Sequence, residues 1–354
     1  QTVEAILAEA VTAMNKDGLT DRGAAAVVEL VDSGELLALA NSPTYDLSTY
    51  RQDYTELSED PAHPLYNRAT STPYAPGSTI KPLTAVAALE EGIVSPTDKI
   101  YSPYTWRYPG DPNSYSNCAG GSHGWINVSQ AITKSCNYFF SEMGYQLGMD
   151  NLREYLSAFG LGAHTGIETG DNTGTLPENR PGEDQAPWAG YGQANQAYTP
   201  LQLANYICTL VSGGVRREPH LLKAVKSYDN SQVLAVGNTE PVQPLELHDA
   251  TLEAVKKGMY GYTQPGGSVA AYFQNCVVTA GAKTGTSQLG GDQKDNGVFV
   301  CFAPYDDPEI VVSIVIEHAG SGAALAPSAV KILNAYFSAD NVSGSITGEN
   351  QLLP

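Results

Sequence analysis

Strand-forming segments lie near both ends of this 354-residue chain, and helical patterns fill the sequence between them. Residues 24–31 and 35–41 are apolar runs on either side of a turn that contains Gly34, which predicts a β-hairpin. Residues 297–303 and 309–317 flank a turn that begins and ends with proline, which predicts a second hairpin. The simplest fold pairs both hairpins in one antiparallel sheet, so the two ends of the chain must meet in one lobe.

Helical periodicity predicts which segments cover this sheet. The terminal helices, at 1–16 and 327–337, are expected on one of its faces. The middle of the chain would form a helical lobe, from the patterns at 79–92, 128–147, 150–159, 200–211 and 249–259. A further strand-like run covers 276–287, and three stretches are expected to be irregular: 42–77, 98–127 and 160–198. The predicted fold class is α+β, with a cleft between a sheet lobe and a helical lobe.

Composition narrows the class of protein and its partners. Apolar residues make up 42% of the chain, which excludes disorder as its main state. No apolar run approaches the roughly 18 residues that a membrane span needs. The chain carries 19 Lys and Arg against 38 Asp and Glu, so it lacks the excess of basic side chains on which binding to phosphates depends. No nucleic acid is therefore expected among its partners.

The segment Ser78-Thr79-Ile80-Lys81 places a serine at the start of a predicted helix and a lysine one turn later. A serine hydroxyl is a weak nucleophile unless a base lies within hydrogen-bond reach, and a buried lysine with a lowered pKa can be that base. The N–H groups at a helix N-terminus also suit an oxyanion. The same spacing recurs at Ser328 and Lys331, which we interpret as the cap of the last helix.

Two further short motifs carry polar side chains suited to catalysis. Ser135-Cys136-Asn137 falls at a predicted break between helical segments, where a hydroxyl could pass a proton and an amide could hold a substrate carbonyl. Lys283-Thr284-Gly285-Thr286 ends a strand-like run. A cation and two hydroxyls on one strand suit a substrate carboxylate, and Gly285 would let a substrate backbone approach closely.

Together, S-x-x-K, S-x-N and K-T-G in this order are the signature of penicillin-binding proteins and serine β-lactamases. Ser328 fails this test of order, because no such motifs follow it. The chain resembles the transpeptidase domain of class B penicillin-binding proteins over about residues 1–337, and residues 60–69 are most similar to the elongation-type group. Residues 338–354 are expected to form a polar tail.

The resemblance implies a five-stranded antiparallel sheet covered by helices, an all-helical lobe and an active-site cleft between them. It also implies a peptidoglycan D,D-transpeptidase. Ser78 would attack the D-Ala-D-Ala carbonyl of a stem peptide, with Lys81 as the base. Ser135, with Lys283 beside it, would return the proton to the leaving amine. No cofactor is required for this chemistry, and β-lactam antibiotics would acylate Ser78.

The remaining motif residues would bind substrate by the same resemblance. Asn137 would hold the substrate amide, and Thr284 and Thr286 would bind the terminal carboxylate. The N–H groups of Ser78 and Thr286 would form the oxyanion hole.

Family members carry a membrane anchor and a pedestal domain before this region, so the chain is expected to be an extracellular fragment that lacks both. The resemblance therefore places the protein at the outer face of the bacterial cytoplasmic membrane, with a membrane-embedded wall-synthesis protein as partner.

Two alternatives stay open. The first is a hydrolase, either a serine β-lactamase or a D,D-carboxypeptidase. A class A lactamase needs a water-activating glutamate in an E-x-x-x-N element, and Glu178 is followed at that spacing by Gly182. The second is a β-lactam sensor or a non-catalytic scaffold of the wall-synthesis complex, and a sensor would share the motif residues.

Cys118, His123 and Cys136 lie within 19 residues and resemble part of a structural zinc site, with Asp111 as a candidate fourth ligand. Two other interpretations remain open. The thiols could be free, with His123 bonded to the loop, or the two cysteines could form a disulfide, which an extracellular location allows.

Overall fold

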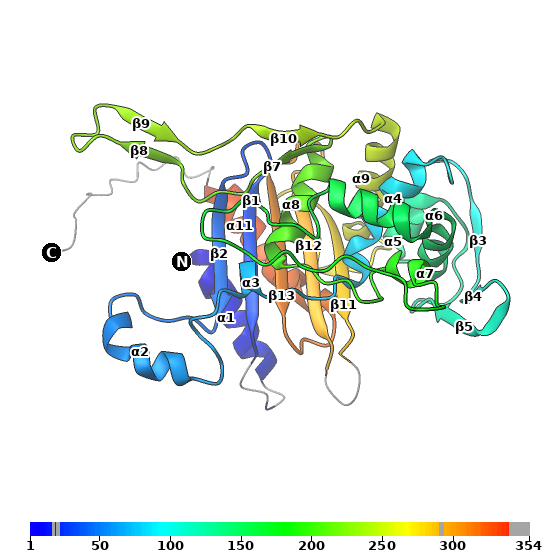
Figure 1. Ribbon diagram of the computed structural model, residues 1–354, viewed down its shortest axis with the longest axis horizontal. Helices are drawn as coiled ribbons and strands as arrows, with labels where there is room; N and C mark the ends of the chain where they lie inside the picture. The colour runs from blue at the N-terminus through cyan, green and yellow to red at the C-terminus, as the bar shows by residue number, and fades with distance from the viewer. Residues whose placement is uncertain (16–17, 19–21, 290–293, 340–354) are drawn as a thin grey trace.

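The computed structural model describes residues 1–15, 18, 22–289 and 294–339. Its centre is a five-stranded antiparallel sheet in the order β11-β12-β13-β1-β2 (Figure 1). The predicted N-terminal hairpin is β1 (Ala24–Leu30) with β2 (Leu36–Ser42), and the predicted C-terminal hairpin is β12 (Asn296–Ala303) with β13 (Ile310–Ile316). They join where β1 pairs with β13. The fifth strand, β11 (Gly281–Ser287), lies at an edge. The predicted sheet is confirmed.

Helices cover the sheet on both faces because both faces of its central strands are apolar. The side chains of Ala24, Ala26 and Val28 share a core with α1 (Thr2–Met14) and α11 (Ala326–Ala339). The alternate residues of β1 belong to the core that contains α8 (Pro200–Val211), which is buried along its whole length. The terminal helices therefore share one face, as predicted, and α8 holds the other.

The second lobe lies beside β11, on the right in Figure 1. It contains α4 (Lys81–Glu90), α5 (Val128–Thr133), α6 (Asn137–Ala158) and α7 (Ala186–Ala189). α9 (Asp249–Thr263) packs against both α5 and β11 and so connects this lobe to the sheet. The lobe also carries two small sheets, formed by β3 (Ile100–Ser102) with β6 (Gly124–Ile126) and by β4 (Thr105–Tyr108) with β5 (Asp111–Asn117). It is thus mainly helical, but not purely so.

Several short elements replace segments that were expected to be irregular or were given no structure. The stretch 42–77 contains α2 (Tyr50–Glu59) and α3 (Arg68–Ser71), and it ends with the first residue of the turn η2 (Gly77–Ile80). Two further hairpin-like pairs join β7 (Val215–Arg217) to β10 (Pro241–Pro244) and β8 (Ala224–Lys226) to β9 (Val233–Val236). The last short elements are α10 (Ala270–Phe273) and η3 (Gly322–Leu325).

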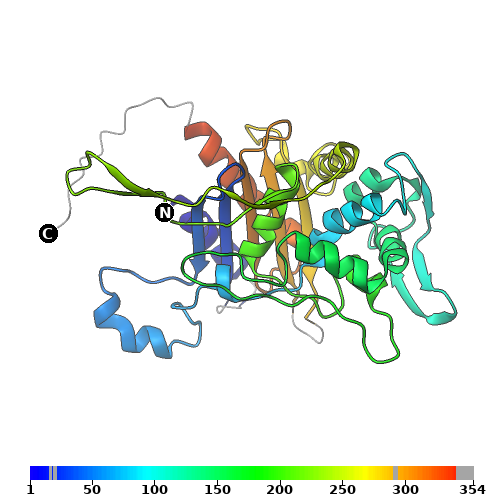
Figure 2. The same cartoon turned by 45° about the horizontal axis from the view of Figure 1, so that its top comes forward.

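Some of these elements bury few or no residues, and the others are only three or four residues long, so neither kind shows the periodic pattern on which sequence reasoning depends. α2 has no buried residue, and every residue of β9 is exposed. Figures 1 and 2 show α2 and the β8–β9 hairpin projecting from the sheet at the end away from the second lobe. Residues 338 and 339 of the predicted tail belong to α11, and the rest of that tail lies outside the described residues. No helix in the described ranges has the length and apolar character to span a membrane.

Candidate active site

The predicted nucleophile lies where a short turn passes directly into a helix. Ser78 belongs to η2, and Lys81 begins α4 immediately afterwards. The backbone N–H of Lys81 donates to the Ser78 carbonyl, which keeps both residues on one turn. Among the described residues, the partly exposed Ser78 hydroxyl has no hydrogen-bond partner. It is therefore free to turn toward a substrate above the helix N-terminus.

Three segments pack backbone against backbone around this turn. Gly77 has a φ of +51°, and a Cβ there would lie 2.6 Å from the carbonyl oxygen of Thr286 on β11. On the other side, Gly192 has a φ of +92°, and its Cβ would lie 1.8 Å from the Gly77 carbonyl oxygen. Glycine is required at both positions, because a side chain would be both strained and in collision. Ser78 is held next to β11 in this way.

Lys81 is fully buried, and the S-x-N segment holds its side-chain nitrogen. Its Nζ donates to the Ser135 carbonyl oxygen at 2.8 Å, to Ser135 Oγ at 3.1 Å and to Asn137 Oδ1 at 2.6 Å. Ser135 lies between α5 and α6 with a φ of +50°, a conformation that costs energy for a serine. The Asn137 amide donates to the Asn117 carbonyl at 2.8 Å, which orients its Oδ1 toward Lys81.

Lys283 approaches the same hydroxyl from the sheet. It is fully buried on β11, and its Nζ donates to Ser135 Oγ at 2.8 Å and to the Thr284 carbonyl at 3.1 Å. The Ser135 hydroxyl therefore lies between the side-chain nitrogens of Lys81 and Lys283. The three motifs, which are far apart in the sequence, converge on one site.

Burial determines the protonation of the two lysines. It lowers the pKa of Lys81 well below that of an ordinary lysine, and the positive charge of Lys283 lowers it further. Burial lowers the pKa of Lys283 to about 7. The environment of Lys81 thus favours a neutral amine with a free electron pair, which is what a general base requires.

The edge strand β11 offers a surface for a substrate backbone. Thr284 and Thr286 are partly exposed, whereas Lys283, Gly285 and Ser287 between and beside them are buried. The two threonines therefore share one face of the strand and are both accessible. A Cβ at Gly285 would lie 2.2 Å from the Pro76 carbonyl oxygen, so this glycine serves the packing of η2 against β11.

The second S-x-x-K of the sequence has no part in the site. Ser328 is the third residue of α11 and is buried, so its interpretation as the cap of that helix is wrong. Lys331 forms an ion pair with Glu9 of α1, with an Nζ to Oε1 distance of 2.6 Å.

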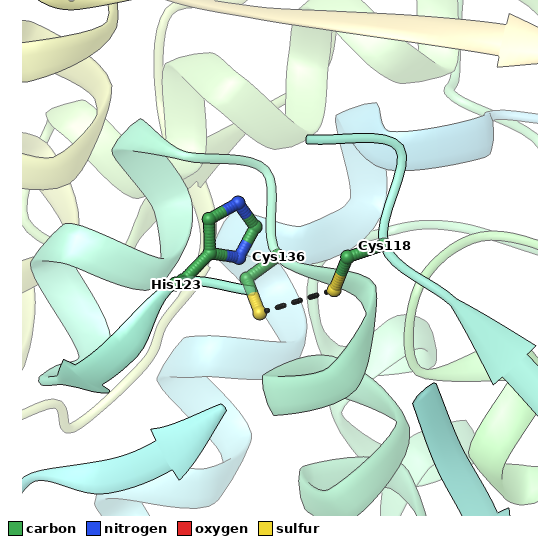
Figure 3. Close-up of side chains that lie close together, drawn as sticks. All are labelled: Cys118, His123 and Cys136. Atoms are coloured by element: carbon green, nitrogen blue, oxygen red, sulfur yellow. Dashed lines mark hydrogen bonds between the residues drawn. The ribbon is translucent and has the colours of Figure 1, made fainter. Parts of the chain in front are cut away.

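Cys118, His123 and Cys136 form a cluster behind the S-x-N segment, and their ligand atoms all lie within 4.8 Å of one another. Figure 3 shows the imidazole and the two thiols pointing into one small space. The two sulfurs are 3.5 Å apart and both cysteines are free, so the structure contains no disulfide here. Asp111 is exposed at the start of β5 and is not part of the cluster.

This cluster has the character of a metal site. His123 Nδ1 is buried and has no hydrogen-bond partner within the described ranges. Cys118 Sγ accepts from the Tyr138 backbone N–H at 3.1 Å, and Cys136 Sγ from the Phe139 N–H at 3.4 Å. A hydrogen bond from the Cys136 thiol lowers the pKa of Cys118 to about 6. An unpartnered imidazole nitrogen beside a stabilised thiolate fits three positions of a tetrahedral zinc site.

Sequence reasoning missed the aromatic residues around the lysines. The ring of Tyr191 lies 6.0 Å from Lys81 Nζ, and Tyr191 also lines a cavity of about 900 Å³ whose lining contains no residue of the three motifs. The Tyr206 hydroxyl donates to the Thr79 carbonyl and ties α8 to η2. Tyr262 on α9 lies against Lys283. Tyr262 lies three residues beyond the predicted end of its helix, and nothing in the surrounding sequence predicts its contact with Lys283.

Known proteins are similar to this chain in sequence and in structure. Residues 24–336 match the family described as penicillin-binding protein transpeptidase domain. The peptidoglycan D,D-transpeptidase MrdA of Escherichia coli (strain K12) is 32% identical over 349 residues, which cover 90% of this chain and 55% of that protein.

Solved structures of penicillin-binding proteins are also similar to this chain in fold. Pseudomonas aeruginosa PBP2 in complex with WCK 5153 has a TM-score of 0.80 at 28% identity, over 93% of this chain and 76% of that one. Penicillin-binding protein A of M. tuberculosis, as its penicillin G acyl-enzyme, has a TM-score of 0.76 at 27% identity, over 88% and 74% of the two chains.

The chain spans about half the length of the curated MrdA relatives that it matches. These relatives agree with the elongation-type group to which the sequence analysis compared it. The match to the family model covers most of the chain, from the first strand of the sheet to the last helix. The chain therefore belongs to the penicillin-binding protein transpeptidase domain family.

Proposed function

We propose that this chain is the catalytic domain of a peptidoglycan D,D-transpeptidase, which joins stem peptides through an acyl-enzyme on Ser78. The proposal rests mainly on the position of the Ser135 hydroxyl, which lies 3.1 Å from Lys81 Nζ and 2.8 Å from Lys283 Nζ. Ser78, in η2, immediately precedes the helix that begins with Lys81. The names of the curated relatives, such as MrdA, favour an enzyme of this class over a sensor or a scaffold.

In the proposed mechanism each group has one step. Ser78 Oγ attacks the carbonyl carbon of the penultimate D-Ala, and its proton passes to the neutral Lys81 amine. The developing oxyanion accepts hydrogen bonds from the N–H groups of Ser78 and Thr286. Collapse breaks the amide bond, and the proton reaches the leaving D-Ala nitrogen through the Ser135 hydroxyl.

In the second half of the reaction, protons move in the opposite direction. The amine of a neighbouring stem peptide attacks the Ser78 ester and gives up a proton, which returns to the Ser78 oxygen as the ester bond breaks. A new amide is formed and the enzyme is regenerated. Thr284 and Thr286 lie on the face of β11 where the terminal carboxylate of the first substrate would bind.

Labelling with a fluorescent penicillin tests the proposal. We expect a lasting covalent label that peptide mapping places on Ser78, and no label on Ser78→Ala. Rapid hydrolysis of the penicillin without a label would instead identify a β-lactamase. Incubation with a D-Ala-D-Ala peptide and an acceptor amine then separates the remaining activities. A new amide product supports transpeptidation, free D-Ala alone indicates a carboxypeptidase, and neither product indicates a sensor or scaffold.

We also propose that Cys118, His123 and Cys136 hold a structural zinc ion, which plays no part in the bond-making steps. The ion would fix Cys136, and through it Ser135 and Asn137 on either side. Metal analysis of protein purified without added zinc tests this. About one equivalent is expected, and less than a tenth of an equivalent would contradict the proposal. The placement at the outer face of the cytoplasmic membrane and the membrane-embedded partner stay predictions from the resemblance.

A further inference from the structure

Tyr262 is a buried tyrosine at the C-terminal end of α9, and only 3% of it is exposed. The next residue, Thr263, donates from its hydroxyl to the Ala280 carbonyl at 2.7 Å, just before β11 begins. This bond fixes the end of α9 against the start of the strand. The Tyr262 side chain is therefore held at a defined place beside the K-T-G motif.

Tyr262 contacts two neighbouring residues of that motif at once. Its ring centroid is 4.4 Å from Lys283 Nζ, well within the range of a cation–π contact, which favours the charged form of the lysine. Its hydroxyl is 2.5 Å from Thr284 Oγ1. The rings that contact Lys81 lie farther away, with the Phe140 and Tyr191 centroids at 5.7 and 6.0 Å.

The paired hydroxyls leave one proton for a ligand. Tyr262 and Thr284 carry one hydroxyl proton each, and the bond between them uses only one of these. When Tyr262 is the donor of this bond, the Thr284 proton is left for an acceptor on the exposed side of Thr284. The ammonium of Lys283 lies beside the pair, so an anionic acceptor is favoured over a neutral one.

We propose that Tyr262 is a positioning residue for the terminal carboxylate of the substrate, holding the Thr284 hydroxyl and the Lys283 ammonium toward that anion. The inference rests on the proposed function, and it adds that selectivity for a free carboxylate depends on a residue outside the three motifs. The hydroxyl of Tyr262 orients Thr284, and its ring supports Lys283.

Two substrates that differ only at the carboxylate test this role. Second-order rates of Ser78 acylation are measured with benzylpenicillin and with its methyl ester. The wild-type protein is expected to prefer the free acid. Tyr262→Phe should lower the rate with the acid about tenfold, because a hydrogen bond to a charged group loses its orientation, and should leave the rate with the ester almost unchanged. Tyr262→Leu, which also removes the ring from Lys283, should lower the acid rate further.

Tyr260→Phe is the matched control, because Tyr260 lies on the same helix and stacks on Tyr305 with centroids 4.2 Å apart. It should leave the acid-to-ester ratio unchanged. Thermal unfolding verifies that each variant is folded. A wild-type ratio retained in folded Tyr262→Phe, or a wild-type protein that reacts equally with acid and ester, overturns the inference while the labelling of Ser78 still supports the proposed function. Absence of any label on wild-type Ser78 overturns both.

Discussion

Lys81 and Lys283 donate hydrogen bonds to the same hydroxyl, that of Ser135, at 3.1 and 2.8 Å. Two buried ammonium groups that share one acceptor repel each other, so one of them is more stable as a neutral amine. Lys81 is the one whose pKa is lowered by burial and by the charge of the other. Lys81 is thus suited to act as the base, and Lys283 to provide positive charge in the site.

These two roles predict that the rate of Ser78 acylation rises and then falls with increasing pH. Acylation of Ser78 should become faster as rising pH removes the proton from Lys81. It should become slower as Lys283, whose pKa burial lowers to about 7, loses its charge. Acylation rates with a penicillin between pH 5 and 10 measure both limbs. Lys283→Arg keeps its charge over this range, so the alkaline limb should disappear. An alkaline limb that persists in Lys283→Arg would assign it to another group.

The Ser135 hydroxyl is predicted to carry a proton during acylation. Ser135→Ala should slow acylation about 100-fold or more, as expected for loss of a proton-transfer group. Ser135→Gly should be as slow, yet more stable than Ser135→Ala by about 1 kcal/mol, because the φ of +50° suits glycine. Acylation rates and urea unfolding of the two variants provide the comparison. A variant that acylates at the wild-type rate would exclude the proposed proton route.

Gly192 is predicted to be essential for acylation because it packs against the backbone of Gly77. A Cβ at Gly192 would lie 1.8 Å from the Gly77 carbonyl oxygen, whereas one at Gly213 would meet nothing within 4 Å. Both glycines have a positive φ, at +92° and +81°, so alanine strains both backbones similarly. Gly213→Ala should cost about 1 kcal/mol of unfolding free energy and keep acylation intact. Gly192→Ala should also lose acylation by displacing the nucleophile turn. Equal behaviour of the two variants would argue against this contact.

The sheet could be predicted from the sequence because its strands are buried and apolar. β12 and β13 are buried at every position, and each lies within one residue of the predicted run. α8 begins and ends where Pro200 and Gly213 indicated. The exposed helix α2 and the short strands β3 to β10 could not be found, because an element that buries little carries no hydrophobic period.

The catalytic motifs could be identified from the sequence, but the residues that pack against them and position them could not. Ser135 and Lys283 stood out through motif order, and the structure places their side-chain atoms 2.8 Å apart. Gly192 and Tyr262 act on residues more than twenty positions away in the chain, and no local pattern announces such contacts. Asp111 is the opposite case, because it is close to Cys118 in the sequence but does not belong to the cluster.

Loss of the proposed zinc ion is predicted to affect both stability and acylation. Cys118→Ser should lower the zinc content, lower the melting temperature by on the order of 5 °C and slow acylation, because Cys136 adjoins Ser135. Wild-type protein should also lose zinc on acidification, because protons compete with the ion for the thiolates and the imidazole. Metal analysis and thermal unfolding measure these effects. Cys276→Ser, which alters a cysteine outside the cluster, is the control. A Cys118→Ser protein with full zinc content would remove that residue from the site.

Glu29 is a buried carboxyl on β1 in contact with α8. Its Oε1 accepts from the Asn205 amide at 2.7 Å, while its Oε2 has no partner in the described part of the chain. Burial raises the pKa of Glu29 from 4.5 to about 8. Between these pH values the folded protein binds more protons at this site than the unfolded chain does. The free energy of unfolding must therefore fall as pH rises through this range.

Glu29→Gln isolates this effect, because glutamine has the shape of the protonated side chain and does not ionise. Relative to Glu29→Gln, the wild-type free energy of unfolding should fall by on the order of 3 kcal/mol between pH 5 and pH 8. Urea unfolding at pH 5, 6.5 and 8 measures the difference. Glu56→Gln, on the exposed helix α2, should follow the wild type at every pH. If Glu29→Gln also runs parallel to the wild type, Glu29 is ionised in the folded protein, and the contact between β1 and α8 holds a charge.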